Sequence, residues 1–96
     1  MRLAGERRFE EAFDVITAKN PLPFITGTIC SHNCMTKCTR LDYDESVLIR
    51  DMKLFAAQNG YDAWLKKHPV ATARYNAKVA IVGAGPSGLS AGYFLA

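Results

Sequence analysis

The pattern of apolar and polar positions predicts a mainly helical chain. Between residues 6 and 19, apolar residues recur at three- and four-residue intervals, which predicts an amphipathic helix with one buried face. The residues on that face are Phe9, Ala12, Phe13 and Ile16. The run Asn20-Pro21-Leu22-Pro23 should end this helix, because proline disfavours the α conformation of the residue before it. Residues 24–29 are expected to be extended or irregular, with a turn at Gly27.

A second apolar stripe predicts a helix between residues 42 and 60. Asp42, with Glu45 three residues later, has the spacing of a capping box. Asn59-Gly60 is typical of a helix C-terminus. Residues 61–67 predict a further short helix that packs Trp64 and Leu65 inward and ends at His68-Pro69. The inner stripe of the longer helix consists of Leu48, Met52, Phe55 and Ala56.

The last part of the chain has a different pattern. Residues 70–77 lose the helical period, which indicates a linker. Residues 78–82 are short, rich in β-branched side chains and followed by glycines, which predicts a buried β-strand; residues 89–96 begin a helix. We therefore expect a helical domain over residues 1–72, a linker at 73–77, and a truncated strand, loop and helix at 78–96.

The loop between that strand and helix reads Gly83-Ala84-Gly85-Pro86-Ser87-Gly88, a G-x-G-x-x-G motif in the strand-to-helix context of dinucleotide-binding domains. Gly83 permits a tight turn, Gly85 lets the backbone approach a pyrophosphate, and Gly88 lets helix and strand pack closely. A glycine-rich turn that matches by chance is the alternative. The acidic residue that binds a ribose is expected about 20 residues later, beyond residue 96. We therefore expect a fragment cut inside its second domain, in which residues 79–96 alone bind no dinucleotide.

All three cysteines, Cys30, Cys34 and Cys38, lie in one C-x3-C-x3-C stretch. Thiolates suit zinc, copper(I) and iron–sulfur clusters, and a four-coordinate site needs a further ligand. In one straight helix the first and last cysteines would be about 12 Å apart, too far for one compact cluster. Either Cys30 precedes the helix, or the thiols serve more than one cluster. A cluster, a zinc site with His32 as fourth ligand, and buried thiols without a metal remain open, although the x3 spacing disfavours zinc.

Composition narrows the range of partners. A net charge of +3 over 96 residues, with scattered basic side chains, predicts no nucleic-acid binding. Residues 79–96 carry no charge, but their glycines and proline argue against a membrane helix. An odd number of cysteines without a signal peptide favours a reducing, cytoplasmic location.

Four stretches in this order resemble one family, the NAD(P)H-dependent glutamate synthase small-subunit family. That group includes the N-terminal part of dihydropyrimidine dehydrogenase and the selenate reductase type of subunit, to which this chain is most similar through its Cys-Thr-Arg-Leu-Asp-Tyr-Asp run. The stretches are Asn20-Pro21-Leu22-Pro23, Thr26-Gly27-x-x-Cys30-x3-Cys34-x3-Cys38-x-Arg40, Asp44-Glu45-Ser46-Val47-x-Ile49-Arg50, and the run from Val79 to Leu89.

The resemblance implies an α-helical ferredoxin-like iron–sulfur domain followed by the start of a Rossmann domain that binds FAD. In the full-length oxidoreductase, electrons would pass from NAD(P)H through FAD and [4Fe–4S] clusters to the active site of a partner. Cys30, Cys34 and Cys38 match cluster ligands, and residues 83–88 match the FAD phosphate loop. Family members carry further cysteines upstream, so the fragment alone is expected to be inactive and to lack part of its ligand set.

Two further expectations concern partners and alternatives. The fragment should associate with the remainder of its own polypeptide and with a larger redox subunit or domain. The unpaired strand is an association hazard, so residues 74–96 are expected to be disordered, to refold as helix, or to pair with a second copy. The alternative function is a small helical zinc-binding or protein-interaction module without redox activity.

Overall fold

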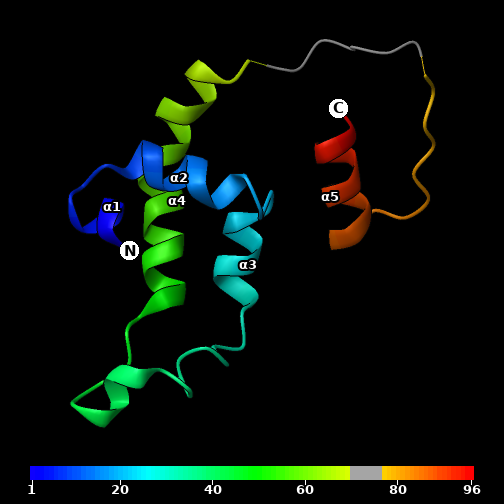
Figure 1. The fold of residues 1–96 in the computed structure, drawn as a ribbon. Coiled ribbons are helices and arrows are strands. Elements are labelled where there is room, and N and C mark those ends of the chain that lie inside the picture. The colour runs from blue at the N-terminus through cyan, green and yellow to red at the C-terminus, as the bar shows by residue number, and fades with distance from the viewer. Residues whose placement is uncertain (70–76) are drawn as a thin grey trace.

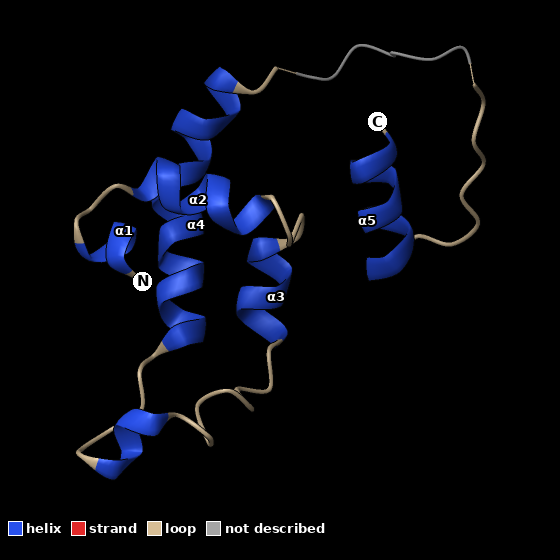
Figure 2. Cartoon of the chain, viewed as in Figure 1, coloured by secondary structure: helices blue, strands red, loops and turns tan. Residues whose placement is uncertain are grey.

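A computed structural model of the protein describes residues 1–69 and 77–96, and within these ranges it contains helices and no strand (Figure 2). The mainly helical class expected for the chain is therefore confirmed. The elements are α1 (Arg2–Gly5), α2 (Phe9–Thr17), α3 (Pro23–Ile29), the 3-10 helix η1 (Thr39–Asp42), α4 (Ile49–Lys67) and α5 (Pro86–Leu95).

The core forms where α2 and α3 pack against the long helix α4 (Figure 1). Phe13 of α2 is 2% exposed, and its ring lies 5.3 Å from that of Trp64 and 5.9 Å from that of Tyr61. Edge-to-face contacts of this kind add to the apolar area that the rings bury. Four alanines are also buried: Ala4, Ala12, Ala56 and Ala57. Small side chains at these positions let the helices approach closely.

The first predicted helix is confirmed in its buried face and corrected at its start. Ala12 and Phe13 are buried, and Phe9 is partly buried. The helix begins at Phe9 rather than at residue 6, because Arg7 has a left-handed φ of 59°, which breaks a right-handed helix. The short helix α1 before this break was not predicted.

The extended segment predicted over residues 24–29 is wrong, because these residues belong to α3. Pro23 stands in its first turn, where a missing N–H costs nothing and the fixed φ suits a helix. Gly27 makes no turn: it is buried in α3, where a Cβ would lie 3.1 Å from the Cβ of Leu54. The proline run thus ends one helix and starts the next, and the glycine serves helix packing.

The two helices predicted over residues 42–67 are a single helix that starts later. Asp42 ends η1, and α4 begins at Ile49 without a side-chain cap, so the Asp42–Glu45 capping box is wrong. Asn59-Gly60 does not end a helix, because Gly60 is buried in the interior of α4. A Cβ at this position would overlap the carbonyl of Phe9, so the packing of α2 on α4 requires glycine here. Leu65, predicted to point inward, is 47% exposed.

The C-terminal segment departs from its prediction in two respects. Residues 78–82 form no strand, since a strand requires a partner and none of the described segments supplies one. The predicted helix is present but begins earlier, at Pro86, and ends at Leu95.

The predicted linker lies largely outside the described residues. In residues 1–69 and 77–96, no helix has the length and apolarity needed to cross a membrane.

Candidate functional site

The three cysteines lie on the connection that leaves α3 and leads through η1 to α4 (Figure 1). Cys30 is the residue at which α3 ends, with φ −62° and ψ 132°. His32 has a left-handed φ of 63°, and residues 33–37 form turns. The chain from Cys30 to Cys38 is therefore an irregular loop, and the single cysteine-bearing helix considered from the sequence does not form.

All three thiols are free, but the loop does not gather them. Cys30 and Cys38 are partly buried, and Cys34 is exposed. Throughout the described part of the chain, no three His, Cys, Asp or Glu side chains lie close enough to hold one metal ion. His32 is thus not brought to the thiols as a ligand. The donor chemistry, three soft sulfur ligands on one loop, nevertheless suits an iron–sulfur cluster.

Cys38 has the most defined surroundings of the three. The backbone N–H groups of Val47 and Arg40 donate hydrogen bonds to its sulfur, and they hold the pKa of the thiol below its usual range. Partial burial and the carboxylate of Asp44 oppose this effect, while the charge of Arg40 adds to it. The structure thus favours the thiolate at Cys38, which is the form that binds metals.

Arg40 and Asp44 form a bidentate ion pair beside this thiol. Arg40 donates from Nε to Oδ1 and from a terminal guanidinium nitrogen to Oδ2 of Asp44, each over 2.7 Å. Sequence reasoning did not single out this pair. The signal that could have found it is the opposite charge at i and i+4, a common spacing for side-chain pairs.

The glycine loop before α5 folds back on itself. Gly83 has a φ of +107°, which favours glycine, and Gly85 is the extended residue that caps α5. A Cβ at Gly88 would overlap the carbonyl of Gly83 and lie 3.4 Å from Ile81, so the first and third glycines lie in contact. The packing of a helix on a strand that was expected at Gly88 is not seen, because residues 78–82 form no strand. Ala84, Pro86 and Ser87 are exposed.

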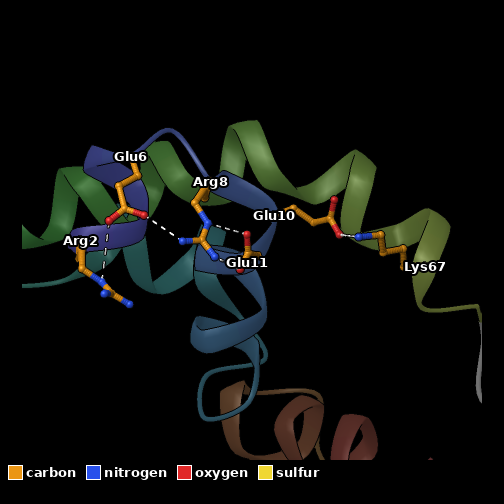
Figure 3. A network of polar contacts seen from close by, with 6 residues as sticks. All are labelled: Arg2, Glu6, Arg8, Glu10, Glu11 and Lys67. Carbon is orange, nitrogen blue, oxygen red and sulfur yellow. Dashed lines mark hydrogen bonds and ion pairs between the residues drawn. The ribbon is translucent and has the colours of Figure 1, made fainter.

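Among the described residues, a group of charged contacts lies around α1, α2 and the end of α4 (Figure 3). Arg8 pairs with Glu6 at 2.9 Å and with Glu11, and Lys67 pairs with Glu10. The side chains of Arg8, Glu6 and Glu11 are about half exposed, and that of Glu10 is 26% exposed. Solvent-exposed pairs contribute little stability. We interpret the network as structural.

Comparison with known proteins decides the family. Residues 1–64, which include all three cysteines, match the family described as dihydropyrimidine dehydrogenase domain II, 4Fe-4S cluster. The chain belongs to this family. The relationship inferred from the sequence motifs is confirmed, and this 4Fe-4S domain family accounts for two thirds of the chain.

The chain also matches parts of much longer proteins, and some of these are named oxidoreductases. "Putative oxidoreductase YgfK" of Escherichia coli K12 is 47% identical over all of this chain, which covers 9% of that protein. The NADPH-Fe(3+) oxidoreductase subunit beta of Geobacter sulfurreducens is 41% identical over 95% of this chain and 14% of its own length. The glutamate synthase [NADPH] small chain of Bacillus subtilis is 32% identical over 86% of this chain and 17% of its own length. No solved structure matches the chain.

Proposed function

We propose that this chain is an electron-transfer segment of an iron–sulfur flavoprotein oxidoreductase. Cys30, Cys34 and Cys38 would be thiolate ligands of [4Fe–4S] clusters, and residues 83–88 would bind the pyrophosphate of FAD. One observation carries the proposal: all three free thiols lie on a single loop within the segment that matches a 4Fe-4S domain family. A bound cluster would supply one-electron transfer.

The thiols do not meet at one point, which bears on how a cluster would be held. Since the relatives are several times longer than this chain, we propose that the remaining ligands come from other segments of a longer polypeptide. Cys38 is the best prepared ligand of the three, because two backbone N–H groups already stabilise its thiolate.

The FAD proposal is supported by the conformation of the glycine loop. Its first and third glycines touch, and the loop leads directly into the N-terminus of α5. N–H groups at a helix N-terminus favour phosphate, and a backbone without side chains can approach it closely. In the full-length protein, NAD(P)H would be the electron donor, as the names of two relatives suggest.

Anaerobic reconstitution with ferrous iron and sulfide tests the cluster proposal. The experiment uses a polypeptide as long as the relatives that contains this sequence, and it compares that protein with its C34S variant. A matched control is T36S, which changes an exposed side chain of the same loop, keeps the hydroxyl that donates to the carbonyl of Asn33 and removes no thiol. We expect C34S to lower iron and sulfide content and T36S to leave both unchanged. Stoichiometric zinc without iron uptake would contradict the proposal.

A further inference from the structure

The imidazole of His68 lies where the end of α4 meets α2. His68 is the C-cap residue of α4, and its ring stacks on that of Trp64, with ring centroids 4.4 Å apart and planes 16° apart. Its Nδ1 lies 3.0 Å from the carbonyl oxygen of Trp64, and its Nε2 lies 3.5 Å from Oδ1 of Asp14 on α2. Each ring nitrogen therefore faces an oxygen that accepts hydrogen bonds and donates none.

This arrangement suits the imidazolium better than either neutral form of the ring. A neutral imidazole carries one N–H, so it can donate to one of the two oxygens and turns a lone pair toward the other. The imidazolium carries an N–H on both nitrogens, and its positive charge attracts the carboxylate of Asp14. The carbonyl groups at the C-terminus of a helix also favour a cation. Both contacts are therefore fully made only when His68 is protonated.

The other charged groups at this end of α4 come from α2 and from α4 itself. Glu10 of α2 pairs with Lys67, the residue before His68 (Figure 3), and the charges of Asp14 and Glu11 also act on Lys67. The positive charge of Lys67 opposes a second one at His68, but it is paired with Glu10. The segment that forms α3, which also packs on α4, contains no titratable side chain. The carboxylates of α2 thus face the imidazole from across the helix interface.

We propose that His68 is a pH-sensitive latch, which holds the C-terminal turn of α4 against Asp14 of α2 when its ring is protonated. The latch tightens as the pH falls below neutral and the imidazolium forms, and it loosens as the pH rises and the ring loses a proton. The two side chains are each 46% exposed, so the effect is that of a partly solvated pair. It acts at the last turn of α4, where the helix ends.

A double-mutant cycle on the 96-residue chain tests the latch. Unfolding constants of the unmodified chain, D14N, H68Q and D14N/H68Q are measured by urea denaturation at about pH 5.5 and about pH 8, on either side of the histidine titration. We expect the coupling between the two residues to change the unfolding constant by about two- to fivefold at the lower pH, the range for exposed pairs, and to vanish at the higher pH. Other titrating groups contribute alike to all four proteins and cancel in the cycle.

The neighbouring pair of Glu10 and Lys67 is the matched control. It joins the same two helices, but a carboxylate and an ammonium group both stay charged between these two pH values. E10Q, K67Q and E10Q/K67Q should therefore give the same coupling at both. If the coupling between Asp14 and His68 were equal at the two pH values, or absent at the lower one, the proposal would be overturned.

The carboxyl carbon of Asp14 gives a second readout that does not depend on stability. Followed by NMR against pH, its chemical shift should show an inflection in the histidine range in addition to its own inflection in acid, because the charge that appears on His68 lies beside it. H68Q should remove this inflection, and K67Q should leave it in place. An Asp14 carboxyl that titrates only in acid would show that the ring does not face it, which would also overturn the proposal.

Discussion

Replacing Gly60 with alanine tests how α2 and α4 pack. Gly60 is buried in the middle of α4, and a Cβ built there overlaps the carbonyl carbon and oxygen of Phe9 and lies 3.0 Å from the Cβ of Phe13. The obstacle is backbone, which cannot rotate away as a long side chain can. The substitution should therefore push α2 off α4.

Two opposing terms give the magnitude. Alanine in a helix interior is about 1 kcal/mol more favourable than glycine. Overpacking a close contact costs about 1–3 kcal/mol, and the upper end applies because α2 must move as a unit. The expected net loss in the free energy of unfolding is about 1–2 kcal/mol. For a domain of this size, this corresponds to a fall in Tm of about 4–16 °C.

The assay is urea and thermal denaturation followed by circular dichroism, with two other glycines as references. G27A places a Cβ 3.1 Å from the Cβ and Cδ1 of Leu54, a milder approach than the overlap at Gly60, so it should cost less. G5A meets nothing within 4 Å and should be neutral or stabilising by up to about 1 kcal/mol. If G60A were as stable as G5A, the close approach of α2 to α4 at Gly60 would be refuted.

Three other predictions concern the core, the loop and pH. Because Phe13 is 2% exposed among aromatic rings, F13A should lower the free energy of unfolding by about 3–5 kcal/mol in urea denaturation; a loss below 1 kcal/mol would contradict the assigned core. G88A should shift the amide NMR signals of α5, because its Cβ overlaps the loop backbone, whereas Gly85 has open space and G85A should not; equal effects would count against the loop geometry. The hydrogen bond from Arg8 holds the pKa of Glu11 below its usual range. The stability that this pair contributes is therefore present at neutral pH and is lost as the carboxylate protonates in acid. E11Q should make stability fall less steeply as the pH is lowered, and an unchanged fall would refute the pairing.

The periodicity of apolar residues predicted the helices that bury one apolar face. It located α2 through Ala12 and Phe13, and it found the part of α4 around Ala56, because burial on one face leaves a period in the sequence. It missed α3, a seven-residue helix that starts within the proline run. A proline at the first helical turn and a proline that ends a helix look alike when only the local sequence is considered.

Glycine was the main source of error. Gly27 was interpreted as a turn and Gly60 as a helix end, but both lie inside helices at points of close packing. The sequence does not distinguish these roles, since each requires only that a side chain be absent. Gly83 has a φ of +107°, a conformation that favours glycine, but the strand that its motif requires before it does not form.

For the candidate site, the sequence predicted residue types and not their arrangement. The spacing of Cys30, Cys34 and Cys38 suggested metal chemistry, but the irregular loop that carries them has no apolar period to locate it. The strand expected at 78–82 depends on partner strands, which local sequence cannot supply.

The most direct test of the proposed function measures the iron and sulfide content after anaerobic reconstitution. The protein used is a polypeptide as long as the relatives that contains this sequence. We predict a brown protein that contains iron and acid-labile sulfide in equal amounts and gives an EPR signal on reduction. Replacing Cys30, Cys34 and Cys38 with serine should remove the iron, the sulfide and the EPR signal. Stoichiometric zinc with no iron uptake, or iron content that survives all three replacements, would contradict it.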